Sequence, residues 1–440
     1  MNLFWKKLFG GILSTAKYEK SEKVLVNDMK RYDEICKSVE LAEYQQLFHV
    51  IKSADFKEKK KTLQNRKYKD TEEYRVSRKF HKLEKDTGIK MYYELLKSEE
   101  LKQYLHFKIT PEYEDLGDKK KVSQSAQLQK LKTFERSKEY RNYTRFHESF
   151  VIKEYEELKT KIASTEFKTQ NEFWSNQHRW KTVPEYVQEQ RYYELAKNPD
   201  IAFFESTKPE KFAQHRKLSK SFADNFDWNT LDKSHWTFGF QSGKTHLKED
   251  YSFDNEYQAN NGGKNVTVHH GVLNIETRHE KVTAPAWNLQ KGFLQKEYQF
   301  TSDVIQTSQS FKQKYGLFRA KIRCTGKVHH AFWLSGNGKL PHVNIFHYNG
   351  KEITMGNAHQ NVMDEVKING ASHSQYYIYS LIWTPKELIW FINDLEVYRT
   401  SANVPQEPMY LGFNSFLPQK QKPATGNMQV DWVRVFALSK

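Results

Sequence analysis

The chain has 440 residues and carries 70 Lys and Arg against 54 Asp and Glu, a formal net charge of +16 at pH 7. This length is sufficient for two or three domains. No apolar run reaches the roughly 18 residues that a membrane-spanning helix needs, so we expect no transmembrane helix. The two cysteines, Cys36 and Cys324, form neither a disulfide framework nor a metal-ligand spacing.

Residues 1–16 have the pattern of a short amphipathic segment. Their apolar run is interrupted by Lys6 and Lys7, which is not typical of a signal peptide. On a helix, Leu3, Phe4 and Leu8 would share one face, which suits a membrane surface, a docking partner or packing on the protein's own domain. The absence of a clear signal peptide favours a cytoplasmic or assembly-associated protein over a secreted one.

The basic excess is concentrated in the first half of the chain. Residues 1–220 contain 47 basic and 35 acidic residues, a net charge of +12, which leaves +4 for the remainder. An anionic partner for residues 1–220 is one interpretation, and solvated helix faces rich in Lys and Glu are the other.

Residues 17–217 are rich in Lys, Glu and Tyr, and they lack the alternation expected of strands. A short motif recurs in which a hydroxyl or amide residue is followed by an acid and then by an apolar residue. This order predicts helix starts, because the first side chain caps free N–H groups and the acid suits the positive end of the helix dipole. The predicted capping residues are Ser38, Ser53, Thr71, Ser98, Thr110, Ser137, Ser164 and Asn198.

Three of the intervals between these motifs are 27 residues long: 71 to 98, 110 to 137 and 137 to 164. We therefore predict an all-α helical repeat array, with a single helical bundle as the alternative. Its histidines, including His49, His81 and His106, are scattered and indicate no metal site. Such an array is typical of a docking or self-association arm.

The pattern changes after the basic stretch 208–220, where we place a linker or a last short helix. From residue 221 onward, strand-length apolar runs alternate with turn residues, as in Tyr377–Trp383 and Leu388–Ile392. Many strands over residues 221–440 predict a two-sheet antiparallel β-sandwich.

Six segments of this half, in order, resemble family-16 glycoside hydrolases, the laminarinase and β-glucanase family. They are Phe222–Asp227, Val268–Ile275, Tyr315–Ile322, Ala331–Leu334, Leu381–Pro385 with Trp390–Asp394, and Met428–Val435. The resemblance implies a concanavalin A-like jelly roll in which one sheet forms a carbohydrate cleft.

The family's active-site strand has the pattern Glu-x-Asp-x-x-Glu, with a bulge that turns the third carboxylate to the side of the first two. The matching positions here are His342, Asn344 and His347. A retaining glycosidase uses one carboxyl group as the nucleophile and another as the proton donor. The resemblance therefore implies that no catalytic residue is left, and we predict a catalytically inactive domain that needs no cofactor.

A sugar cleft without catalysis can still bind glycan through aromatic and imidazole side chains. The candidate ligand-binding residues are Trp333, Trp287, Tyr348, His329, His330 and His359. Two alternatives remain open: a glycoside hydrolase that uses a rebuilt His-rich cleft, or an enzyme in which these histidines bind Zn²⁺ or Cu²⁺. The spacing of the histidines matches no metal motif. A further hypothesis is a structural or assembly role without a glycan ligand.

Overall fold

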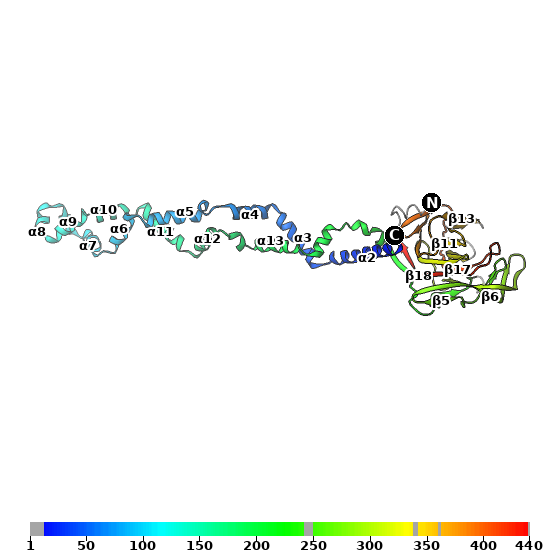
Figure 1. Cartoon of the computed structure of the whole chain (residues 1–440). Coiled ribbons are helices and arrows are strands. Elements are labelled where there is room, and N and C mark those ends of the chain that lie inside the picture. Colours follow the sequence, from blue (N-terminus) through cyan, green and yellow to red (C-terminus); the bar gives the residue numbers. More distant parts are fainter. Residues whose placement is uncertain (1–12, 242–249, 338–341, 360–361, 439–440) are drawn as a thin grey trace. The chain divides into compact units, whose positions relative to one another are not determined.

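The computed structural model describes residues 13–241, 250–337, 342–359 and 362–438. The chain divides into two compact units (Figure 1). One unit, called here the helical unit, is Glu34–Ser206, and the other, the β unit, combines the residues up to Asp33 with Thr207–Lys440. Most of the expected N-terminal segment 1–16 lies outside the described residues.

The helical unit consists of short helices joined by tight turns. Its α-helices are α3 (Val39–Lys52), α4 (Ala54–Asn65), α5 (Glu72–Glu84), α6 (Thr87–Leu96), α7 (Glu99–Lys108), α8 (Lys119–Gln124), α9 (Ala126–Glu135), α10 (Lys138–Phe146), α11 (Phe150–Ala163), α12 (Thr165–Ser175), α13 (Pro184–Leu195) and α14 (Pro199–Ser206). The 3₁₀ turns are η1 (Tyr68–Asp70), η2 (Pro111–Gly117) and η3 (Arg179–Thr182).

The predicted helix starts are confirmed at most positions. The side chains of Ser38, Ser53, Thr71, Ser98, Ser137 and Ser164 each accept a hydrogen bond from a backbone N–H in the first turn of the following helix. Thr110 differs, because it precedes the 3₁₀ turn η2 and its side chain makes no capping bond. Asp86, Asp118, Ser125 and Ser149 are caps that the motif did not include.

Early helices of this unit pair with late ones in an antiparallel run, which Figure 1 shows for α5 beside α11 and α6 beside α10. Aromatic rings fill the seam between the two limbs. Tyr44 stacks on Tyr192 at 5.2 Å between ring centroids, and Tyr92 stacks on Tyr143 at 5.7 Å. These aromatic side chains are thus part of the core of the helical unit. None of the described helices is both long enough and apolar enough to span a membrane.

The β unit begins with α2 (Thr15–Ile35), whose residues up to Asp33 belong to it, and resumes with η4 (Pro209–Phe212) and α15 (Ala213–Arg216). Its strands are β1 (Leu218–Asp224), β2 (Thr237–Phe238), β3 (Ser252–Phe253), β4 (Gln258–Asn260), β5 (Val266–His269), β6 (Val272–Asn288), β7 (Gly292–Ser302), β8 (Val304–Gln306), β9 (Gly316–Gly326), β10 (His329–Ser335), β11 (His342–Asn349), β12 (Ile353–His359), β13 (Val362–Ile368), β14 (Tyr377–Trp383), β15 (Leu388–Ile392), β16 (Leu395–Thr400), β17 (Tyr410–Phe416) and β18 (Gly426–Leu438). The expected domain limits, 17–217 and 221–440, stay a prediction, and these units differ from them at both ends.

The strands form the two sheets of a β-sandwich, as the sequence predicted. In the described residues one sheet has the order β16-β15-β14-β9-β18-β6-β7-β4, with β1, β3 and β5 paired at its side, and the other has the order β13-β12-β11-β10-β17-β8-β2. Large side chains from both sheets, including Phe332 and Phe346 from one and Phe318 and Trp383 from the other, meet in one core. Their burial holds the sheets together.

The helix α2 is bound to the β unit through buried charges. Glu22 forms an ion pair with Arg319 of β9 at 2.6 Å, and the Arg319 side chain is only 6% exposed. Glu19 accepts hydrogen bonds from Lys321 of β9 and from the Trp432 indole of β18. Because these partners come from central strands, this helix is an integral part of the β unit.

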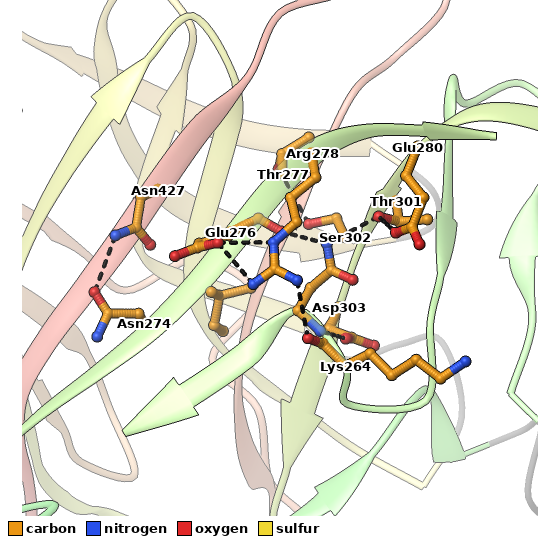
Figure 2. A network of polar contacts seen from close by, with 12 residues as sticks. Lys264, Asn274, Glu276, Thr277, Arg278, Glu280, Thr301, Ser302, Asp303 and Asn427 are labelled. Atoms are coloured by element: carbon orange, nitrogen blue, oxygen red, sulfur yellow. Dashed lines mark hydrogen bonds and ion pairs between the residues drawn. The ribbon is translucent and has the colours of Figure 1, made fainter. Parts of the chain in front are cut away.

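A polar network joins the strands β6 and β7 to the turn that precedes β5 (Figure 2). The buried carboxylate of Asp303 accepts hydrogen bonds from the backbone N–H groups of Asn261, Gly263 and Asn265. Arg278 pairs with Glu276 and donates to the carbonyl oxygen of Lys264 (Figure 2). Each of these polar groups has a partner inside the network, which indicates a structural role.

Candidate functional site

The site is built around a bulge in β11. Trp333 of β10 pairs with Asn344, but Phe332 pairs with Phe346, so one residue of β11 is extra at this point. Ile345 and Phe346 consequently both face the core. This extra residue brings the side chain of His347 to the same face as Asn344, as the family resemblance implied.

A carboxylate that sequence reasoning did not include reaches this face from β13. Asn344 pairs with Gly356 of β12, and Gly356 pairs with Glu365 of β13. Oε1 of Glu365 accepts hydrogen bonds from Nδ2 of Asn344 at 3.1 Å and from Nδ1 of His347 at 3.3 Å. We call Glu365, His347, Asn344, His342 and His329 the site cluster.

The hydrogen bonds of the site cluster determine where the imidazole protons lie. Nε2 of Gln421 donates to the carbonyl oxygen of Asn349, so this atom is the amide nitrogen, and it also donates to Nε2 of His329 at 2.6 Å. His329 must then carry its proton on Nδ1, which donates to Nε2 of His347 at 3.1 Å. His347 is therefore the Nδ1–H tautomer, and this nitrogen lies 3.3 Å from Oε1 of Glu365 and 3.2 Å from Oγ1 of Thr354.

A second chain of hydrogen bonds ends on the same carboxylate. Because Nδ2 of Asn344 donates to Glu365, its Oδ1 is free to accept, and Nε2–H of His342 donates to it at 2.9 Å. At the position of the family's nucleophile, Nε2–H of His342 is thus already used in a hydrogen bond to Asn344. His347, at the position of the family's acid and base, has both ring nitrogens engaged.

Burial favours the neutral form of His329 and His342. It lowers the pKa of His329 to about 4, with the neighbouring His347 adding to the effect, and it also lowers the pKa of His342. Burial raises the pKa of Glu365, but hydrogen bonds from His347, Asn344 and Thr354 outweigh it, so this pKa lies below its ordinary value. Glu365, the carboxylate of the cluster, therefore favours its ionised form.

Trp333 lies on the same sheet face beside the cluster, with its ring 5.6 Å from that of His342. Its indole N–H donates to Oδ1 of Asn414, and its ring packs against Tyr410. The side chain is buried, with 5% of its surface exposed. Its contact with a sugar would be limited to the exposed edge.

The other predicted ligand residues are not brought to the cluster. Tyr348 is buried in the core and stacks on His373, and His330 is buried beside it, bonded to Ser415 and to the carbonyl oxygen of Thr325. Their strand neighbours His329 and His347 face the other side, because alternate residues of a strand point in opposite directions.

Trp287 lies on the β6–β7 hairpin, where its ring contacts Phe293. The backbone of His359 pairs with Val362 of β13, and its side chain lies outside the described residues. No group of three or more His, Cys, Asp or Glu in the described part of the chain is placed to hold a metal ion.

Comparison with known proteins connects this sandwich to one family. Residues 253–434 match the model of "Glycosyl hydrolases family 16". The C-terminal half contains a family-16 glycoside hydrolase domain. The matched region begins later than the resemblance seen in the sequence, which started at Phe222.

Two curated relatives match the family-16 half, both from Rhizobium meliloti (strain 1021). Endo-1,3-1,4-beta-glycanase ExsH is 24% identical over 255 residues, and Endo-1,3-1,4-beta-glycanase EglC is 26% identical over 253 residues. Each alignment covers 50% of this chain and 52% of the relative. The chain therefore spans about half the length of these relatives.

Solved structures similar to this domain include two glucanases. The laminarinase catalytic domain from Thermotoga maritima MSB8 aligns with a TM-score of 0.41 and 18% identity, covering 51% of this chain and 100% of that one. The endo-beta-1,3-glucanase from Pyrococcus furiosus aligns with a TM-score of 0.41 and 17% identity, covering 51% of this chain and 95% of that one.

Proposed function

We propose that the family-16 domain binds a neutral β-glucan chain without hydrolysing it. The family match supports a glycan as the ligand. Both relatives are named as endo-1,3-1,4-beta-glycanases, so glucans with β-1,3 and β-1,4 linkages are the first probes. The observation that carries the proposal is the engagement of both nitrogens of His347, which leaves no proton to donate to a glycosidic oxygen.

The nucleophile position supports the same proposal. A retaining mechanism needs a second carboxyl group about 5–5.5 Å from the first. In the described site cluster, Glu365 is the one carboxylate, and the residues at the family positions are His342, Asn344 and His347. Imidazole is a poor replacement for the nucleophile, because a glycosyl-imidazolium would place positive charge beside an oxocarbenium-like centre.

Glu365 also favours the alternative, which is a hydrolase with a rearranged site. The Glu365 side chain is 25% exposed, and its carboxylate is hydrogen-bonded to Asn344, His347 and Thr354. A carboxylate oxygen of this kind can act as a nucleophile or a base. Hydrolysis by this route requires a separate proton donor, and the cluster's histidines are all committed to hydrogen bonds within it.

Two assays on the full chain separate these possibilities. We expect laminarin or lichenan to retard the protein in affinity electrophoresis, while reducing ends released from either glucan stay at the level of buffer alone. Release of reducing ends that is lost in both the His347→Ala and Glu365→Gln variants would overturn the non-hydrolytic proposal. Absence of retardation by every neutral β-glucan would overturn the proposal of binding.

We further propose that the helical unit serves as a docking or self-association arm. It exposes large apolar side chains at helix ends, including Val39 (78% exposed) at the start of α3, Ile109 (81%) after α7 and Phe150 (76%) at the start of α11. Exposed apolar side chains are sites where another surface can pack. Light scattering after size-exclusion chromatography tests this role: a mass above 52.4 kDa that returns to the monomer value in a triple Ala variant supports it, and a monomer at all concentrations contradicts self-association.

A further inference from the structure

We infer that Glu365 is the positioning residue of the glycan site, and that it restricts the central subsite to neutral sugars. The inference rests on the proposed function, and it assigns a role to a residue outside the family's active-site strand. The position of Glu365 is set by strand register, and its effect is set by the direction of the hydrogen bonds that end on it.

Gly356 is what allows Glu365 to reach the site cluster. It lies between Asn344 and Glu365 in the sheet, and a Cβ atom built on it would stand 1.9 Å from the carbonyl oxygen of Asp364. Any side chain at this position would displace β13. With glycine there, the carboxylate of Glu365 extends across β12 to the side chains of β11.

Both hydrogen-bond chains of the cluster run toward this carboxylate. One chain passes from Gln421 through His329 and His347, and the other passes from His342 through Asn344. A carboxylate only accepts hydrogen bonds, so it fixes the donor direction of every group before it. Without this acceptor, Nδ2 of Asn344 would lose the bond that sets the orientation of its amide, and Nδ1 of His347 would keep only Oγ1 of Thr354, at 3.2 Å.

This polarity selects the chemical class of the ligand. The cluster presents one carboxylate and three imidazoles, and none of its residues is a Lys or Arg. Sugar hydroxyl groups can donate to Glu365, which is a favourable charge-assisted contact. A carboxylated or sulfated sugar at this place would bring like charge beside Glu365 with no cation to offset it. We therefore expect unsubstituted hexose units to bind and acidic sugars to be excluded.

The first test measures the imidazole tautomers in the full-length protein without any ligand. Long-range proton–nitrogen NMR correlation of protein labelled with [¹⁵N]histidine, with resonances assigned by single His→Gln variants, should find His329 and His347 protonated at Nδ1 and His342 protonated at Nε2. In Glu365→Gln at least one of the three should change tautomer or show a mixture. The same tautomers in Glu365→Gln as in the wild type would overturn the positioning role.

The second test compares affinities for a laminarin hexasaccharide and for its carboxymethylated form. We expect the wild type to bind the neutral form about tenfold more tightly, Glu365→Gln to bind the neutral form about tenfold more weakly than the wild type, and the preference for the neutral form to shrink in this variant. Asp364→Asn is the matched control, because it removes the same charge one residue away on the opposite face of β13.

The outcomes of the two tests are distinguishable. Failure of the wild type to bind any neutral glucan defeats the proposed function, and the tautomer measurement still decides the positioning role of Glu365. Binding of the neutral hexasaccharide with equal affinity for the carboxymethylated form defeats the neutral-sugar restriction alone. An effect of Asp364→Asn as large as that of Glu365→Gln would assign the preference to overall charge.

Discussion

At the residue scale, His330 shows how burial of an imidazole couples the fold to pH. It lies in the core between the sheets, and burial lowers its pKa to about 3, well below its ordinary value near 6.5. The unfolded chain therefore binds a proton below about pH 6.5, which the folded state does not bind until about pH 3. Stability must fall as the pH falls through this window.

Between pH 7.5 and about pH 4.5, we expect protonation of His330 in the unfolded chain to lower the unfolding free energy by about 2–3 kcal/mol. In His330→Gln, which can keep bonds to Ser415 and the Thr325 carbonyl, the loss over this interval should shrink by that amount. Urea unfolding at the two pH values measures it. His269→Gln, at an exposed position, should leave the wild-type loss unchanged.

Site residues differ in how far the sequence could reveal them. The positions 342, 344 and 347 followed from the spacing of polar residues in an apolar strand, and the structure places their side chains on one face. Tyr348 and His330 are buried on the core side of their strands, because alternate residues of a strand point in opposite directions and their neighbours His347 and His329 face the cluster. Glu365 required knowledge of strand pairing, although a glycine within a strand, Gly356, did signal a close backbone approach.

At the scale of elements, helix starts were predictable because each cap is a local interaction. Ser53, for example, caps α4 through a bond to a residue three positions away. Helix α3 pairs with α13, which joins residues more than a hundred positions apart in the sequence. Helix α6 pairs with α10, which joins residues about fifty positions apart. No local pattern encodes such pairs, so the regular motif intervals indicated short helices without indicating which limb packs on which.

Substitution of Tyr104 should destabilise the core between the two limbs of the helical unit. This side chain is fully buried, its ring lies 4.7 Å from that of Tyr140, and its hydroxyl donates to Glu135 at 3.0 Å. Tyr104→Ala should lower the unfolding free energy of this unit by about 3–5 kcal/mol, measured by far-ultraviolet circular dichroism in urea. Tyr104→Phe keeps the ring and should cost about 1 kcal/mol, because Tyr113 and Lys132 also bond to Glu135. Equal losses for the two variants would contradict a packing origin.

The attachment of α2 to the β unit should be sensitive to acid. Burial raises the pKa of Glu22, but hydrogen bonds and charges from His215 and Arg319 outweigh it and bring the pKa to about 2. The unfolded value is higher, so this stabilisation of about 3 kcal/mol is complete above about pH 4.5 and is lost as the pH falls toward 2. Acid titration of the unfolding midpoint should show this loss in the wild type and not in Glu22→Gln.

At neutral pH, Glu22→Gln should destabilise the β unit by about 3–5 kcal/mol, because it leaves the buried Arg319 guanidinium without its anion. The matched variant is Asp28→Asn, on the same helix. Its partner Lys211 lies at 3.2 Å and both side chains are about one-third exposed, so the expected cost is below about 1 kcal/mol. A similar cost for both variants would show that burial of the pair contributes nothing.

At the scale of the whole molecule, the course of the chain suggests that the helical unit is an insertion into the β unit. The chain leaves the β unit after Asp33 and returns at Thr207. The two ends are held together within the β unit: Asp33 pairs with Arg216, and the ring of Tyr32 lies 5.7 Å from that of Phe212. The residues at the junction can therefore be joined by a short linker.

We expect replacement of residues 34–206 by a Gly-Ser linker of about four residues to give a folded protein. It should keep the unfolding midpoint of the β unit and its retardation by laminarin, because α2 still supplies Glu19 and Glu22 to β9. A chain that starts at residue 218, close to the boundary expected from sequence, lacks these partners of Arg319 and Lys321. It should unfold at a lower urea concentration, with a shift at least as large as that of Glu22→Gln.

One outcome would contradict this account. If the shorter chain matched the full chain in stability while the linker variant failed to fold, α2 would be dispensable and the inserted unit would be the element that supports the sandwich.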